Sequence, residues 1–274
     1  MIRVFTKRNK WTPVDDLAYV GYPPLFRPPE QPVRISVVFT WDISFALEIK
    51  SAWEAHYNDV QIGGPAFDAP GDEFVPGRFI KDGVTFTSRG CGRRCPWCFV
   101  PKREGRLREL TIQPGHIIQD NNFLQCSKPH VSAVFDMLRE QNKAATFSGG
   151  LDTRLLNQWN KDLFDSIKIK ELWFACDTKH MTAHLKKTAE LFCNYTPSKR
   201  RCYVMIGFDG ESIVDAEKRL EKVYDLGFLP FCQLYQGNEK KLYSKDWCNL
   251  QRKWSRPAAY RATEKVRANE LPGL

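Results

Sequence analysis

Short apolar runs alternate with amphipathic segments from about residue 83 onward, and this alternation constrains the fold more than any other feature of the chain. We expect the runs to be strands and the segments between them helices, because their apolar spacing changes from strand to helix period. Alternating strands and helices form parallel sheets, either open or curled into a barrel. Six strands in about 150 residues fall short of an eight-fold barrel of ~250 residues, so we predict an α/β fold with a partial (β/α)6 TIM-like barrel. The strands are expected at 84–88, 116–119, 145–148, 171–176, 202–207 and 229–234, and the helices at about 130–142, 153–166, 181–194 and 212–226.

The first 77 residues follow a different pattern. Six prolines interrupt the first 32 residues, where we expect an irregular, extended arm laid over a domain. A strand at 34–40, a helix at 42–57 and a strand at 59–65 then form a β-α-β unit. The predicted domains are a small N-terminal β-α-β extension, the barrel and a basic tail that packs on the barrel. Their residues are 1–77, 78–237 and 238–274.

Composition and charge narrow the classes of protein. No stretch approaches the ~20 apolar residues of a membrane span, and no secretory signal pattern is present, so we expect a soluble, cytoplasmic protein without membrane contact. Nine cysteines, an odd number, favour metal or redox chemistry over a disulfide framework in such a chain. The formal net charge of +9 permits an anionic partner such as nucleic acid.

Three cysteines lie within eight residues, directly after the first predicted barrel strand. Cys91, Cys95 and Cys98 have the spacing CxxxCxxC. Such a loop can wrap one face of a [4Fe–4S] cluster, each thiolate binding a different iron. The fourth iron then lacks a local ligand, and a small molecule with an amine and a carboxylate can chelate it. Loops at the carboxyl ends of parallel strands form the active sites of such folds, so this position suits catalysis.

Other interpretations of the three cysteines remain open. A structural zinc site normally needs four protein ligands, and no histidine flanks the triplet. One alternative is a zinc- or iron–sulfur-stabilised nucleic-acid-binding module without catalysis, and another is a cluster protein that only transfers electrons. The other six cysteines show no clustered spacing, and we expect most of them to be buried apolar residues. They are Cys126, Cys176, Cys193, Cys202, Cys232 and Cys248.

The cysteine pattern, with Trp97 just before the last cysteine, resembles the radical S-adenosylmethionine (radical SAM) superfamily. The flanking residues 87–91 (TSRGC) and 98–108 (CFVPKREGRLR) resemble the subgroup of tRNA methylthiotransferases and cobalamin-binding radical SAM proteins. The resemblance covers roughly residues 83–237. It implies reductive cleavage of S-adenosylmethionine to a 5′-deoxyadenosyl radical. It also implies a flavodoxin- or ferredoxin-like electron donor, with a nucleic acid or nucleotide as the favoured substrate.

Polar residues follow the second and third predicted strands. Asp120 and Asn122 lie where the family binds the methionyl amine, usually through a glycine-glycine-glutamate turn that this chain lacks. Ser148 precedes Gly149 and Gly150, which would let a ligand approach the backbone closely. Asp152 is either a polar contact for a ribose or carboxylate, or the N-cap of the next helix.

The later strand ends carry further candidates. Asp177 resembles the family position that contacts the ribose hydroxyls. Glu211 resembles the glutamate beside the adenine, and its alternative role is to complement a helix dipole. Gln233 and Tyr235, after the sixth strand, are expected to face the substrate.

Two more features bear on partners. Residues 34–65 resemble a fragment of the Rossmann-like domain of cobalamin-dependent relatives, but no Asp-x-His-x-x-Gly motif is present, so we expect no cobalamin. Basic residues surround the cysteine loop and crowd the C-terminal tail, where Trp247 and Trp254 are interleaved with them. Basic and aromatic residues together suit a nucleic-acid surface. The alternatives are tryptophans packed on the barrel, and arginines that compensate an anionic cluster.

Overall fold

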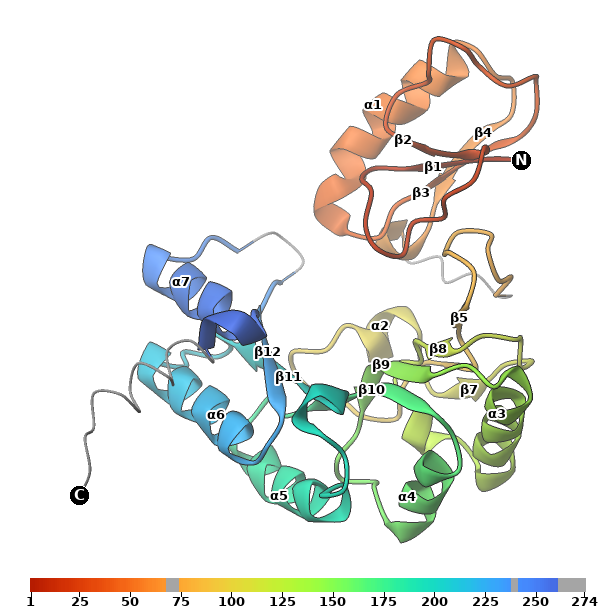
Figure 1. Cartoon of the computed structure of the whole chain (residues 1–274). Coiled ribbons are helices and arrows are strands. Elements are labelled where there is room, and N and C mark those ends of the chain that lie inside the picture. The colour runs from red at the N-terminus through yellow and green to blue at the C-terminus, as the bar shows by residue number, and fades with distance from the viewer. Residues whose placement is uncertain (68–73, 238–240, 261–274) are drawn as a thin grey trace.

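Two parallel sheets organise the protein. The computed structural model describes residues 1–67, 74–237 and 241–260. An N-terminal sheet of four strands lies beside a sheet of six strands (Figure 1). The two main clusters of buried apolar side chains share no residue, so each sheet has its own core. The predicted α/β class with parallel sheets is confirmed.

The N-terminal sheet has the strand order β2-β1-β3-β4, and every pairing is parallel. Helix α1 covers it and buries Ala46, Ile49 and Trp53. The predicted β-α-β unit of β3, α1 and β4 is therefore present. The elements are β1 (Ile2–Phe5), β2 (Ala18–Val20), β3 (Val33–Ser36), α1 (Ile43–Glu54) and β4 (Val60–Gly63).

The prediction of an irregular arm over the first 32 residues was wrong, because this segment contributes two of the four strands. Ile2 and Val4 of β1 are fully buried, and β1 pairs with both β2 and β3. The six prolines all lie in the connections outside these strands. Strands of three and four residues are too short to produce an apolar alternation that stands out in the sequence.

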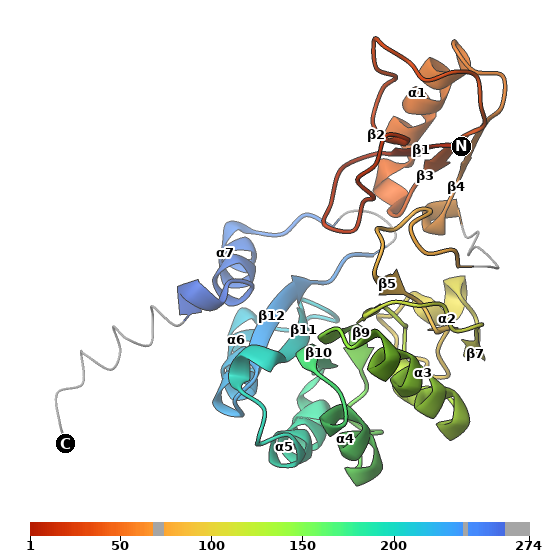
Figure 2. The ribbon, with the colours of Figure 1, turned by 45° about the vertical axis from the view of Figure 1, so that its right-hand side comes forward.

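The six-stranded sheet has the order β12-β11-β10-β9-β8-β5, so neighbours in the sheet are consecutive along this part of the chain. All its pairings are parallel, and β5 and β12 form its two edges. Helices α3 to α6 pack on one face (Figures 1 and 2). All six predicted strands and four predicted helices are present, and all except β12 have shifted ends. They are β5 (Val84–Thr85), β8 (Ile117–Ile118), α3 (Lys128–Gln141), β9 (Ala145–Leu151), α4 (Gln158–Asp165), β10 (Ile169–Ala175), α5 (Thr182–Leu191), β11 (Arg200–Ile206), α6 (Ile213–Asp225) and β12 (Leu229–Leu234).

The strand predicted at 84–88 is split in two. After β5 the chain leaves the six-stranded sheet, and the Thr87 N–H there donates to the Asp120 carboxylate at 2.7 Å. Strand β6 (Ser88–Arg89) then pairs antiparallel with β7 (Arg108–Glu109). These two strands form the base of the cysteine loop, defined here as residues 90–107, which includes the short helix α2 (Val100–Arg103).

Helix α7 (Lys245–Trp254) lies against α6 and β12 (Figure 1). Trp254 is buried and stacks on Tyr260, and the half-buried Trp247 contacts Tyr243. Both tryptophans therefore pack against the core of the six-stranded sheet, which was one of the two predicted alternatives. Residues 238–240 and 261–274 of the predicted basic tail lie outside the described residues.

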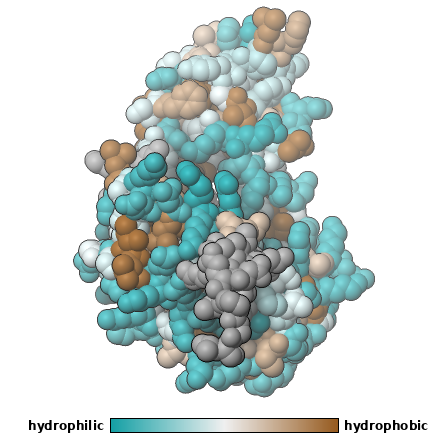
Figure 3. Space-filling model, turned by 60° about the vertical axis from the view of Figure 1, so that its left-hand side comes forward, coloured by the Kyte–Doolittle hydropathy of each residue, from teal (hydrophilic) through white to brown (hydrophobic). Residues whose placement is uncertain are grey.

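Hydrophilic side chains dominate the face in Figure 3, and none of the described helices has the length and apolarity to cross a membrane.

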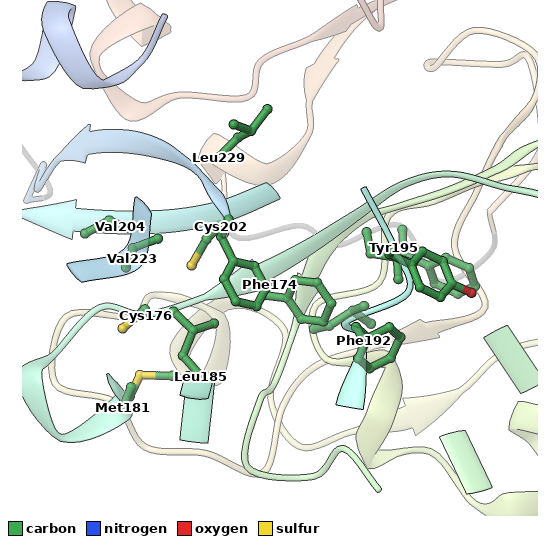
Figure 4. Close-up of a cluster of buried hydrophobic side chains, with 14 of the residues drawn as sticks. Phe174, Cys176, Met181, Leu185, Phe192, Tyr195, Cys202, Val204, Val223 and Leu229 are labelled. Atoms are coloured by element: carbon green, nitrogen blue, oxygen red, sulfur yellow. The ribbon is translucent and has the colours of Figure 1, made fainter. Parts of the chain in front are cut away.

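Four of the six cysteines outside the loop are buried, as predicted for most of them: Cys126, Cys176, Cys202 and Cys232. Cys176 and Cys202 lie among apolar side chains such as Phe174 and Leu185 (Figure 4). Burial raises the pKa of Cys176 to about 11. Such thiols behave as small apolar residues.

Candidate functional site

A cavity of about 710 Å³ lies at the carboxyl ends of the six strands. The cysteine loop and the segments after β8, β9 and β10 supply lining residues, and so do β11, the end of β12 and the segment after it. Residues 39–41, which follow β3 of the N-terminal sheet, also line it. The carboxyl ends of both sheets therefore face the same space.

Cys91, Cys95 and Cys98 are free, half-buried thiols that all line this cavity. The Cys91 sulfur accepts hydrogen bonds from the Arg93 backbone N–H at 3.3 Å and from Asn122 Nδ2 at 3.5 Å. Cys95 bonds to the Arg154 side chain, and Cys98 to the Val100 backbone N–H. Burial raises the pKa of Cys95 and Cys98, and these donors oppose it. Each of the three sulfurs thus has an N–H donor.

These thiols do not form a single-ion site. In the described ranges, no three His, Cys, Asp or Glu side chains are grouped to hold one metal ion. The thiolates of a [4Fe–4S] cluster each bind a different iron. Three cysteines can therefore hold such a cluster without converging on a single metal ion. The cluster prediction for the three cysteines stays a prediction.

Residues that follow β8 anchor the cysteine loop. The Gly90 N–H donates to Asn121 Oδ1 at 2.9 Å, and the Gly92 N–H donates to Gln125 Oε1 at 2.7 Å. Gly90 has a φ of +82°, and a side chain there would collide with the Arg106 backbone. The loop is therefore held in place by side chains that lie about 30 residues away in the sequence.

Asp120 is buried and lines the cavity, but both of its carboxylate oxygens already have partners. Oδ1 accepts the Thr87 N–H, and Oδ2 accepts the hydroxyls of Thr87 at 2.6 Å and Ser88 at 2.7 Å. Burial raises the pKa of Asp120, against the effect of these hydrogen bonds. Asp120 therefore positions the segment that leads into the cysteine loop.

Asn122 differs from Asp120 because it has an acceptor to spare. Its side chain is only 5% exposed, and Nδ2 donates to the Cys91 sulfur and to Asp152. Oδ1 is buried and has no hydrogen-bond partner in the described part of the protein. A buried acceptor without a partner costs free energy, so this oxygen indicates a missing donor in the cavity.

Asp152 is not the N-cap of α4, and that alternative was wrong. Asn157 caps this helix in a reciprocal capping box with Asn160. The Asp152 carboxylate instead binds Arg93 at 3.0 Å and Arg154 at 2.6 Å. Burial works against ionisation, but the hydrogen bonds and charge of Arg154 and the charge of Arg93 outweigh it and lower the pKa of Asp152.

The two glycines after Ser148 both line the cavity, and Gly149 has a packing role as well. A side chain on Gly149 would collide with the Asp120 backbone, so this glycine permits close contact between β9 and the segment after β8. Gly150, with a φ of +97°, has more room and lines the cavity. Ser148 Oγ lies in the cavity wall and accepts from Gln119 Nε2 at 2.8 Å.

Asp177 lines the cavity, whereas Glu211 is absent from its lining. Burial raises the pKa of Asp177, opposed by hydrogen bonds from the Met205 N–H and the Trp97 side chain. Glu211 accepts the Gly207 N–H at 3.0 Å and pairs with Arg219 at 2.7 Å. Glu211 therefore holds the turn after β11 and does not contact the cavity directly.

The lining also includes residues that sequence reasoning missed. Phe39, Thr40 and Trp41 come from the N-terminal sheet, and Tyr203 and Met205 from the inward face of β11. Alternation along β11 could have indicated the last two. No sequence pattern connects residues 39–41 with a loop 50 residues further on. The predicted pair Gln233 and Tyr235 does line the cavity.

Comparisons with known proteins add no family to this description. No protein-family model matches the chain. No curated protein matches its sequence either. The fold and the cavity are therefore the observations that bear on function.

Proposed function

We propose that the chain is a radical SAM enzyme in which Cys91, Cys95 and Cys98 hold a [4Fe–4S] cluster and S-adenosylmethionine binds beside it. When bound, the cluster supplies the electron that cleaves S-adenosylmethionine to a 5′-deoxyadenosyl radical. One observation carries the proposal: three free thiols, each with an N–H donor, line one cavity at the strand ends of a parallel sheet. The proposed fold is a partial (β/α)6 TIM-like barrel, supported by six parallel strands in chain order.

The residues around the thiols fit an anionic cluster. Hydrogen bonds to the ligating sulfurs tune the reduction potential of such clusters. Arg154 contacts the Cys95 sulfur, and both Arg93 and Arg154 line the cavity. Their positive charges offset those of the thiolates and of a cofactor carboxylate. Asp152 holds both guanidinium groups in place.

Three of the five cofactor candidates would touch S-adenosylmethionine, and the other two would hold the turns around it. The free Asn122 Oδ1 would accept a hydrogen bond from the methionyl ammonium group. Ser148 and Asp177 line the cavity and would bind the cofactor directly, Asp177 at the ribose hydroxyls. Asp120 and Glu211 would act through the turns that they hold.

The proposed substrate is a nucleic acid or a nucleotide, and the proposed electron donor is flavodoxin- or ferredoxin-like, in the cytoplasm. The net charge of +9 supports an anionic substrate. Arg93 and Arg103 line the cavity, and their positive charge supports an anionic substrate.

Anaerobic reconstitution of the full chain with iron and sulfide tests the proposal. We expect about four irons per chain, and 5′-deoxyadenosine after addition of dithionite and S-adenosylmethionine. Replacement of Cys91, Cys95 and Cys98 together by alanine should abolish both. Cys193→Ala, at an exposed cysteine outside the cavity, is the matched control and should change neither. One zinc per chain with no cleavage would contradict the proposal and favour the non-catalytic module.

A further inference from the structure

Two aromatic rings of the N-terminal sheet stand outside its core. Phe39 and Trp41 flank Thr40 in the segment after β3. Their rings are stacked, with centroids 4.8 Å apart and planes 8° from parallel. Both side chains are 38% exposed, and neither belongs to either apolar core. Large rings that contribute little to core packing suggest a binding surface.

This aromatic pair and the three thiols line the same cavity. Phe39 and Trp41 line the same space as the three cysteines, although they come from the other sheet. Figures 1 and 2 show the N-terminal sheet beside the six-stranded sheet from two directions. In the described residues, the ring contact recorded for Trp41 is with Phe39, whereas Phe39 also has Lys7 over its ring. The Trp41 indole is therefore the ring available for a ligand.

Positive charge flanks the pair on both sheets. Lys7 Nζ lies 5.2 Å from the centroid of the Phe39 ring, and it is 3.1 Å from Asp42. Arg93 and Arg103 line the cavity from the cysteine loop. An aromatic surface with cations on separate elements suits bases joined by phosphates, since every base has a π face and each link carries a negative charge.

We propose that Trp41, backed by Phe39, stacks a base of a single-stranded nucleic acid at the cavity mouth, with its phosphates along Lys7 and Arg103. This assignment rests on the proposed function, because the stacked strand would present the substrate to the cofactor site. A single strand is favoured over a mononucleotide because the cations lie on separate elements: Lys7 follows β1 and lies over the Phe39 ring, whereas Arg103 belongs to α2 and lines the cavity. An apolar peptide would use the rings but not the cations.

Fluorescence anisotropy with a labelled mixed-sequence oligonucleotide of about 12 nucleotides tests this surface. The reconstituted full chain is used without dithionite or S-adenosylmethionine. We expect Trp41→Ala to raise Kd about tenfold, Trp41→Phe to raise it much less, and Lys7→Ala to weaken the salt dependence. Phe26→Ala is the matched control: Phe26 is 89% exposed, outside the cavity, and should leave Kd unchanged.

An unchanged Kd for Trp41→Ala would overturn the proposal. So would equal affinity for a mononucleotide, or displacement of the oligonucleotide by an apolar peptide. Binding and cleavage are measured separately, so loss of oligonucleotide binding would leave S-adenosylmethionine cleavage standing, and absence of cleavage would leave the binding result standing.

Discussion

The two parallel sheets present different chemistry to the same cavity. The six-stranded sheet and its loops contribute thiols, carboxylates, amides and arginines as well as aromatic rings, whereas the N-terminal sheet contributes two aromatic rings and a threonine. Their interiors differ in the same way. Among the described residues, thirteen buried polar or charged side chains belong to the segment from residue 85 onward, and Thr12 is the one before it.

The two sheets differ in what holds them together near the cavity. Buried polar groups cost free energy unless they are hydrogen-bonded, and the buried carboxylates of Asp120 and Asp152 are hydrogen-bonded. The network of Asp120, Asn122 and Asp152 connects three strand ends to the cysteine loop. The N-terminal sheet is held mainly by apolar packing around Trp53. The rings of Phe39 and Trp41 lie outside this core.

Removing the largest side chain of the N-terminal core is the strongest test of this difference. Trp53 is fully buried and donates from Nε1 to the Gly21 carbonyl at 3.0 Å. We expect Trp53→Ala to destabilise the N-terminal sheet by about 3–5 kcal/mol, measured by native-state hydrogen exchange. Protection should fall in β1, β3 and β4 and persist in β9 to β11. Equal loss in both sheets would show that the two cores unfold as one unit.

Matched glycines test how tightly the strand ends of each sheet are packed. Gly149→Ala would drive a methyl group into the Asp120 backbone, and we expect a loss of about 1–3 kcal/mol in urea unfolding. Gly63, at the end of β4, has no atom within 4 Å of an added Cβ. Gly63→Ala should therefore change stability by less than about 1 kcal/mol. Similar losses at the two positions would contradict the close contact between Gly149 of β9 and the Asp120 backbone.

Removing the free amide oxygen tests the polar cavity wall most directly. We expect Asn122→Ala to weaken S-adenosylmethionine binding about tenfold, since a hydrogen bond to a charged group contributes ~1.5–3 kcal/mol. Equilibrium binding to reconstituted protein measures this. Gln61→Ala, at an exposed amide of β4, is the control. Unchanged affinity at normal iron content would remove Asn122 from the cofactor site.

Much of the six-stranded sheet was predictable from the sequence, because each strand and helix carries its own apolar period. β12 was predicted at its observed bounds, Leu229–Leu234. The strands β1 and β2 were missed, since their partners lie up to 31 residues away and the strands are too short to show a period. The N-cap of α4 was misplaced because Asp152 and Asn157 are both good caps, and only the contacts with Arg93 and Arg154 distinguish them.

The sequence by itself determined the spacing of Cys91, Cys95 and Cys98 and their place after the first strand of an alternating β and α series, because both are local properties of the chain. The tertiary structure decided which residues meet those thiols. In the folded protein, Asp120 is hydrogen-bonded to the segment before the cysteine loop, whereas Asn122 keeps an oxygen without a partner. Trp41, which follows a strand of the other sheet, lines the same cavity. Hydrogen bonds and ring contacts between distant segments depend on how the two sheets pack, and no local pattern records that packing.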